Sequence, residues 1–208
     1  RPRVIEGFTE MLRAREPQAA LLALNRFRLL CAVRRGPFGL ESLNQLVEEI
    51  LSEARLLSAR QRWYAGRPVL VTRNDYNLRL YNGDVGIILP DSATGEPRAW
   101  LAAGGETPRS VPPVRLPEHE TVFAMTVHKS QGSEFQDVLL VLPEQDSPVL
   151  SREMIYTGAT RARRSVEVWL EEKTFQLGLA RRTRRTRGLA ERLRGGDDKI
   201  QDGNPSAV

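Results

Sequence analysis

The densest group of chemically versatile side chains occupies residues 126–135, which read TVHKSQGSEF. This run holds a hydroxyl, an imidazole, an ammonium, an amide and a carboxylate, together with a glycine that lets a ligand approach the backbone closely. It follows an apolar segment typical of a buried strand, and open α/β sheets bind ligands just beyond the carboxyl ends of their strands. The pattern therefore predicts a site for phosphates and ribose hydroxyls; the alternative is a solvated loop in which Gly132 closes a turn.

A second cluster ends the helix that the sequence predicts over residues 151–163. The small residue Gly158 and its alanine neighbours would let this helix pack closely against another element while Arg161 reaches past it. A guanidinium held in this way can stabilise charge on a transferring phosphoryl group, as an arginine finger does. We expect Arg163 and Arg164 to be solvated charges that complement the helix dipole at its carboxyl end.

Hydrophobic periodicity predicts the elements that position these clusters. In chain order they are two helical stretches around Pro17 within 4–26, a buried strand at 27–33, an amphipathic helix over 40–58, and strands at 121–127, 137–142 and 165–170. A buried strand flanked by helices is typical of a parallel sheet, so the fold class is α/β.

Residues 67–116 interrupt this pattern. Short β-runs alternate there with turn sequences such as Asn82-Gly83 and Gly104-Gly105, which indicates a small all-β insert that closes as a barrel. We interpret Asn74 and Asp75 in this insert as turn formers. The polar, glycine-rich residues 195–208 are expected to form a disordered tail.

Composition narrows the class of protein. The 208 residues are 40% hydrophobic and 27% charged, and no apolar run approaches the roughly 20 residues that a membrane helix needs. The one cysteine, Cys31, excludes an internal disulfide and favours a reducing cytoplasm. The net charge of +5 is concentrated in residues 151–194, which hold 12 basic and 5 acidic side chains. Almost all the basic residues are arginine, whose forked guanidinium suits phosphate.

The two clusters resemble conserved motifs of a known class. Residues 126–135 are similar to motif V of superfamily 1 DNA helicases, and residues 156–163 (YTGATRAR) to their motif VI, at the expected separation. Residues 27–44 and 73–84 resemble in particular the C-terminal part of the RecD family, the α subunits of exodeoxyribonuclease V. The resemblance covers about residues 20–194.

The resemblance implies a nucleotide site. Arg161 would be the motif VI finger that contacts the γ-phosphate of ATP, and Glu134 would reach the ribose. Gln131 and Gly132 would lie near the phosphates.

It also implies a DNA site, in which Thr126 and His128 contact single-stranded DNA with Lys129 nearby. Either Arg34 or Arg35 would be the motif IV arginine that also reaches the γ-phosphate; the sequence does not choose between them.

The same resemblance implies a domain organisation. Residues 1–66 and 117–194 would form the discontinuous, RecA-like motor domain 2A, and residues 67–116 the small barrel of domain 2B. The sequence contains no G-x-x-x-x-G-K-[ST] loop and no strand ending in a magnesium-binding acidic pair before the motifs. Together with the start at Arg1, this predicts an excised second motor half, which we expect not to hydrolyse ATP alone because the ligands of Mg²⁺ would lie outside it.

The favoured interpretation is therefore the C-terminal half of a 5′-to-3′ ATP-driven DNA helicase. Its expected partners are DNA, an N-terminal RecA-like domain of the same chain and the RecB and RecC subunits, in double-strand break repair and recombination.

Two alternatives stay open. One is a stand-alone module whose barrel and arginine-rich tail bind the backbone of a single-stranded nucleic acid. Against it, the insert offers only Tyr76, Tyr81 and Trp100 as aromatic residues and is not strongly basic. The other is a free-standing RecD-like or relaxase-type helicase. Residues 181–187 (RRTRRTR) are either phosphate contacts or a solvated helix face.

Overall fold

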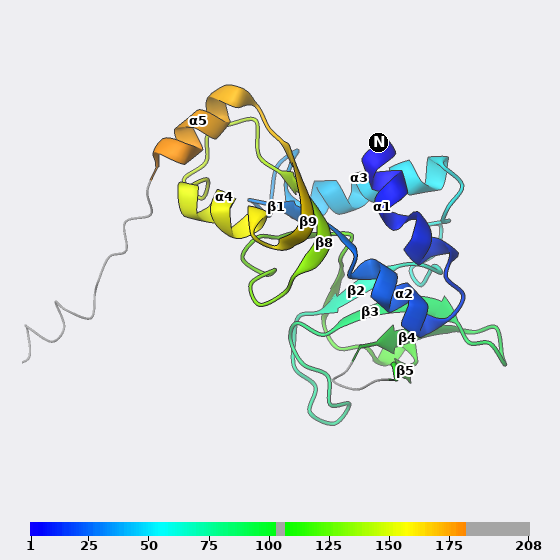
Figure 1. Cartoon of the computed structure of the whole chain (residues 1–208). Helices are drawn as coiled ribbons and strands as arrows, with labels where there is room; N and C mark the ends of the chain where they lie inside the picture. The colour runs from blue at the N-terminus through cyan, green and yellow to red at the C-terminus, as the bar shows by residue number, and fades with distance from the viewer. Residues whose placement is uncertain (103–106, 182–208) are drawn as a thin grey trace, which may run out of the picture.

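A computed structural model describes residues 1–102 and 107–181 of the chain. Two sheets form its framework (Figure 1). One is parallel and lies between two groups of helices; the other is antiparallel and is built from the middle of the chain. None of the described helices combines the length and apolar character needed to cross a membrane. The chain is thus mixed α/β, as predicted.

The parallel sheet has the strand order β7-β1-β8-β9. Its strands are β1 (Phe27–Cys31), β7 (Ala124–Thr126), β8 (Phe135–Val141) and β9 (Ala162–Trp169). Cys31 lies level with Thr126 on one side and Val141 on the other. All three strand ends therefore meet at one edge of the sheet, and the strands begin at the opposite edge.

Helices cover both faces of this sheet (Figure 1). One face carries α1 (Pro2–Arg13), α2 (Pro17–Leu24) and α3 (Leu40–Glu53), and the other carries α4 (Arg152–Ala159) and α5 (Glu172–Ala180). On the first face the fully buried ring of Phe8 packs edge-on against Phe27 and Phe123, with centroids 5.1 Å apart in both pairs. Side chains alternate along β1, so Leu30 joins the second core, on the side of α4.

The antiparallel sheet has the order β5-β4-β3-β2-β6 and a core of its own. Its strands are β2 (Pro68–Val71), β3 (Val85–Pro90), β4 (Pro97–Leu101), β5 (Arg109–Val111) and β6 (His119–Thr121), with the 3-10 helix η1 (Pro113–Arg115) before β6. Within the described residues, β5 and β6 are edge strands with one partner each. The sheet is therefore open, and the predicted closure into a barrel is not confirmed.

The boundaries of several predicted elements shift. The expected strand over 121–127 is two strands, because β6 pairs with β2 while β7 pairs with β1. The antiparallel sheet thus extends to Thr121. The expected helix over 151–163 ends at Ala159, and β9 begins at Ala162, so Arg163 and Arg164 are strand residues and not helix-end charges. The predicted tail at 195–208 and residues 182–187 lie outside the described residues.

Candidate functional site

At the edge where β1 and β7 end, a small ion-pair network joins three elements. Glu120 on β6 accepts hydrogen bonds from Arg34 Nη2 and Lys129 Nζ, each at 2.9 Å. Partial burial by itself would raise the pKa of Glu120, but the hydrogen bonds from Lys129 and Arg34 outweigh it and hold that pKa below its ordinary value. His128 is exposed beside this network, and so is Arg35. At this edge two cations, Arg34 and Lys129, share one carboxylate, and His128 and Arg35 are their neighbours in the chain.

The loop after β7 is held by its own polar atoms. Thr126 is 6% exposed, and its Oγ1 accepts a hydrogen bond from the backbone N–H of Lys129 at 3.3 Å. Ser130 is fully buried and donates to the carbonyl of Val127 at 2.7 Å. Gly132 has a φ of 87°, in the left-handed region that favours glycine. Thr126 therefore shapes the loop, while the side chain of His128 faces solvent.

The loop crosses the sheet and ends at its opposite edge, where β8 and β9 begin. There the carbonyl of Arg161 accepts a hydrogen bond from the N–H of Phe135 at 2.8 Å. The guanidinium of Arg161 donates from Nε to the carbonyl of Thr157 at 3.1 Å and from Nη1 to that of Ser133 at 3.3 Å. Within residues 1–102 and 107–181, no carboxylate oxygen lies within 4.0 Å of this guanidinium. Its positive charge is positioned without being neutralised.

Helix α4 sets the place of Arg161. Ser151 caps its N-terminus by accepting a hydrogen bond from the N–H of Met154 at 3.3 Å, a role that serine side chains commonly take. A Cβ on Gly158 would lie 3.1 Å from both Leu140 Cδ1 and Val127 Cγ2. The helix therefore packs against β8 as closely as a glycine allows. Arg161 follows two residues after the end of the helix.

The remaining charges at this edge are paired. Glu134 is about half exposed and accepts a hydrogen bond from Arg163 Nε at 2.7 Å. Arg164 donates through two nitrogens to the buried carboxylate of Asp137, and Ser165 Oγ donates to it at 2.6 Å. These hydrogen bonds, that from Arg164 foremost, hold the pKa of Asp137 below its usual range. Gln131 and Gly132 are exposed on the loop between the two edges.

The structure thus separates residues that the sequence grouped together. Arg34 follows the end of β1, whereas Arg161 and Glu134 lie beside the start of β8. Because β1 and β8 are parallel, the seven residues of β8 place the two edges about 20 Å apart. Neither Arg34 nor Arg35 is brought to Arg161. Lys129 and His128 share the edge of Arg34.

Arg28 is a residue that sequence reasoning missed. It is 1% exposed on β1, donates to the carbonyl of Val122 at 2.6 Å and stacks on the ring of Phe135 at 5.0 Å. Burial lowers the pKa of Arg28 to about 10. It borders a cavity of about 250 Å³ that Ser133 and Glu134 also line. The available signal was a charge in the middle of an apolar strand.

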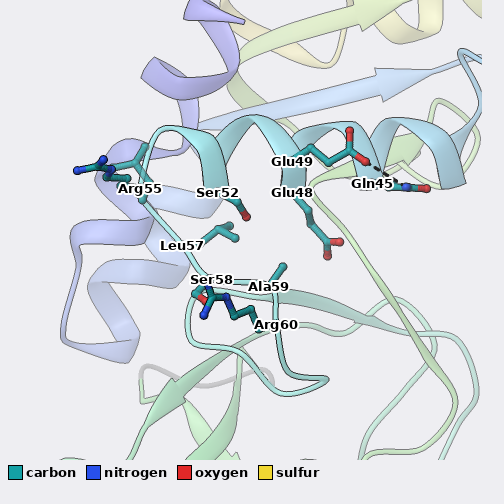
Figure 2. A pocket seen from close by; sticks show the side chains of 10 residues that line it. Gln45, Glu48, Glu49, Ser52, Arg55, Leu57, Ser58, Ala59 and Arg60 are labelled. Carbon is teal, nitrogen blue, oxygen red and sulfur yellow. Dashed lines mark hydrogen bonds between the residues drawn. The ribbon is translucent and has the colours of Figure 1, made fainter.

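A larger hollow lies beside α3. It measures about 710 Å³ and is formed by α3 and the segment after it, with Gln45, Glu48 and Glu49 on its rim (Figure 2). Gln45 donates to Glu49 at 3.1 Å, and Glu48 accepts a hydrogen bond from Tyr64. None of the predicted site residues lines it. Among the described residues, no three His, Cys, Asp or Glu side chains are grouped as a metal site would require.

Residues 121–168 match the family model of the UvrD-like helicase C-terminal domain. The matched segment runs from the end of β6 through β7, the loop, β8 and α4 into β9, and so contains both predicted motifs. By this match, the segment is similar to the C-terminal domain of UvrD-like helicases.

The particular relatives are RecD proteins. The chain is 40% identical over 178 residues to the RecBCD enzyme subunit RecD of Haemophilus influenzae, covering 85% of this chain and 26% of that protein. It is 46% identical over 174 residues to RecD of Mycobacterium tuberculosis, covering 84% and 30%. The predicted resemblance to RecD is confirmed.

A more distant relative is the ATP-dependent RecD2 DNA helicase of Deinococcus radiodurans, 34% identical over 170 residues, or 80% of this chain and 23% of that protein. Among solved structures, Pif1 helicase from Bacteroides in complex with ADP-AlF3 and ssDNA aligns with a TM-score of 0.46 and 14% identity, over 80% of this chain and 47% of that one. The chain spans between about a quarter and a third of the length of the RecD proteins it matches.

Proposed function

We propose that this chain is the C-terminal motor half of an ATP-dependent DNA helicase of the RecD type, which moves 5′ to 3′. The observation that carries the proposal is the state of Arg161. Its guanidinium is fixed by two carbonyl groups, has no carboxylate partner among the described residues and lies beside Glu134. A fixed and unneutralised cation is what the transfer of a phosphoryl group requires.

In this proposal the edge where β8 and β9 begin faces the nucleotide. Arg161 stabilises the charge of the γ-phosphate, and Glu134 accepts hydrogen bonds from ribose hydroxyls, with Arg163 orienting its carboxylate. The phosphates would contact the side-chain amide of Gln131 and the backbone of Gly132, which no side chain covers. Arg34 and Arg35 are left out of this nucleotide site because they lie at the other edge.

The opposite edge faces single-stranded DNA. His128 is exposed there, and Lys129 and Arg34 are cations whose shared partner is Glu120. DNA phosphates would compete with Glu120 for these cations. The loop after β7 connects this edge to the nucleotide edge in eight residues. Arg161 is hydrogen-bonded to the end of this loop through Ser133 and Phe135, so a change at Arg161 can reach the DNA contacts through the loop.

The chemistry that ATP and Mg²⁺ supply needs a second half. The residues present fit the sugar and γ-phosphate of the nucleotide, whereas no described cluster fits the metal. We assign the phosphate-cradling loop and the Mg²⁺ ligands to an N-terminal RecA-like domain. This chain by itself is then expected to show no ATPase activity with or without DNA; robust DNA-stimulated hydrolysis by the purified chain would contradict the proposal.

The names of the relatives, RecBCD enzyme subunit RecD, support a subunit that assembles with RecB and RecC. Within this proposal the complex is exodeoxyribonuclease V, which acts in the cytoplasm in double-strand break repair and recombination. The similarity to RecD2 favours a second candidate, a free-standing helicase. Copurification of RecB and RecC with the tagged full-length protein would support the subunit, and a monomeric active helicase would support the second candidate.

The decisive experiment replaces Arg161 in the full-length protein. Arg161→Ala should lower DNA-stimulated ATP turnover by about 10³-fold, since finger arginines contribute on that order. Nucleotide affinity should fall far less. Arg161→Lys should restore little, because an ammonium lacks the forked geometry.

Arg152→Ala is the matched control, because Arg152 is exposed at the opposite end of the same helix. Near-normal turnover of Arg161→Ala would show that the finger is placed wrongly. Arg164 is not a suitable control, since it pairs with Asp137.

A further inference from the structure

The loop between β2 and β3 presents two tyrosine rings to solvent. Tyr76 is 74% exposed and Tyr81 is 47% exposed. Their ring centroids lie 6.3 Å apart, with the planes at 73°. Large apolar surfaces that face water cost free energy, so an exposed aromatic pair is a candidate contact surface.

The loop that carries the pair is held by its own hydrogen bonds. Asp75 and Leu80 exchange two backbone hydrogen bonds, at 2.7 and 2.9 Å. Asn74 Oδ1 accepts from the N–H of Asn82 at 2.8 Å, and Asp84 Oδ2 accepts from the N–H of Tyr81 at 2.8 Å. The turn-forming role expected for Asp75 agrees with the hydrogen bond that its Oδ1 accepts from the N–H of Leu78 at 2.9 Å, whereas Asn74 joins the two ends of the loop.

The anchoring also fixes the direction of the rings. Leu80 is fully buried in the core of the antiparallel sheet, and Arg109 on β5 donates to the carbonyl of Leu78. The residues on either side of Leu80 therefore cannot turn inward with it. Tyr81 is held outward on a loop tied to the sheet at two points.

The exposed charges of the loop are cationic. Arg73 and Arg79 are exposed, whereas Asp75 and Asp84 are partly buried and accept hydrogen bonds from backbone N–H groups. Aromatic rings flanked by guanidinium groups suit unpaired bases, since every base has a π-face and the arginines attract the backbone. A double helix hides these faces, so the surface is complementary to a single strand.

The loop begins beside the proposed DNA edge. The N–H of Thr72 donates to the carbonyl of Glu118 at 2.8 Å. Glu118 precedes by two residues Glu120, which binds Lys129 and Arg34. Two residues of extended chain span about 7 Å, roughly the spacing of neighbouring nucleotides in an extended strand. A strand that contacts Lys129 therefore reaches the base of the tyrosine loop within a few nucleotides.

We propose that Tyr76 and Tyr81 form a stacking platform for the unpaired bases of single-stranded DNA, continuous with the contacts at His128 and Lys129. This inference rests on the proposed function, because it extends the same DNA path onto the antiparallel sheet. The platform holds bases without reading their sequence, and the cations at the sheet edge hold the phosphates.

The test measures binding of the full-length protein to a fluorescent oligothymidylate by anisotropy at several salt concentrations. Tyr76→Ala/Tyr81→Ala should weaken binding by about 10-fold or more, since stacking on one aromatic side chain typically contributes on that order. The salt dependence should stay unchanged because no phosphate contact is lost. Tyr76→Phe/Tyr81→Phe should bind like the parent protein, because the ring is kept.

Val114→Ser is the matched control: Val114 is 79% exposed on the same insert and is not aromatic. Tyr76→Trp adds a direct readout, since its fluorescence should be quenched when the oligonucleotide binds. Parent-like affinity of the double alanine variant, or a phenylalanine variant as weak as the alanine one, would overturn the platform, and would leave a protein partner as the occupant of this surface.

Different measurements test the tyrosine platform and the proposed function, so either can be contradicted without the other. With saturating DNA, the tyrosine variants should retain ATP turnover and require only a higher DNA concentration for half-maximal rate. Loss of turnover at saturating DNA would contradict a binding role for the tyrosines. A normal rate for Arg161→Ala would instead contradict the proposed function, whatever the tyrosine variants do.

Discussion

The two edges of the parallel sheet carry similar numbers of charged groups and use them differently. Where β1 and β7 end, Arg34 and Lys129 share one carboxylate, Glu120. Where β8 and β9 begin, Arg163 and Arg164 each have a carboxylate, and Arg161 is held by carbonyl groups instead. At the first edge, a bound polyanion would have to displace Glu120 from Arg34 and Lys129. At the second edge Arg163 and Arg164 are paired with carboxylates, and the guanidinium of Arg161 has no carboxylate partner among the described residues.

After Arg161→Ala, the largest expected effect on turnover tests how rigidly the second edge is built. Gly158→Val forces α4 away from Leu140 and Val127 and carries Arg161 with it. We expect a loss of about 1–3 kcal/mol in the free energy of unfolding, as overpacking usually costs. ATP turnover of the full-length protein should fall by about 10-fold or more, because small displacements of a catalytic group are costly.

Gly178→Val on α5 provides the comparison. A Cβ there would lie 2.7 Å from Leu150, so the packing is at least as tight, but α5 carries no site residue. This variant should lose similar stability, measured by denaturant unfolding, and keep its turnover. Equal loss of turnover in the two variants would show that global destabilisation, and not the position of Arg161, decides the rate.

A smaller and opposite effect is expected at the first edge. Glu120→Gln removes the carboxylate shared by Arg34 and Lys129, so both cations become available to phosphates. Affinity for single-stranded DNA at low salt should rise by about 3- to 10-fold, with a steeper decrease as salt is added. Glu118→Gln removes the same charge two residues away without touching either cation, and should leave binding almost unchanged. Weaker binding of Glu120→Gln would mean that the network positions the DNA contacts.

The smallest effect is expected in the stability of the protein at acidic pH. Because the pKa of Asp137 is lower in the folded protein than its ordinary value near 3.8, its contribution to stability is present above that value and is lost as pH falls through the folded-state pKa. Arg164→Ala should lower the midpoint of thermal unfolding at neutral pH and make the acid loss begin at higher pH. Arg163→Ala, whose partner Glu134 is exposed, should change the pH profile less. Identical profiles for the two variants would refute a special role for the Asp137 pair.

Much of the fold is predictable from the sequence because its strands and helices have strong periods. The pairs of helices around Pro17, the buried strand at 27–31 and the change of character at residue 67 all follow from local pattern. The end of α4 does not, because Arg163 and Arg164 are compatible with either a helix end or an exposed edge strand. Pairing with β8 decides it, and pairing is not local.

The candidate site shows the same limit. The types of its residues are readable, but the edge on which each one lies depends on where strands begin and end. The sequence predicts Arg34 after a strand and Arg161 at the end of a helix, both as contacts to the γ-phosphate, and only the parallel registers of β1, β8 and β9 place them at opposite edges. Arg28 was hidden because its neighbours are apolar, and its partner, the carbonyl of Val122, is distant in sequence.

The crossing of the chain between the two sheets has a consequence for how the protein folds. β1 and β7 are neighbours although about 90 residues separate them, and the N–H of Val122 bonds to the carbonyl of Pro68 at 3.1 Å. Once β2 and β6 have paired, the loop that remains to be closed shrinks to about 40 residues, which lowers the entropic cost of closure by about 0.7 kcal/mol. If the antiparallel sheet forms first, its pairing of β2 with β6 would bring β7 close to β1 and act as a template for the parallel sheet.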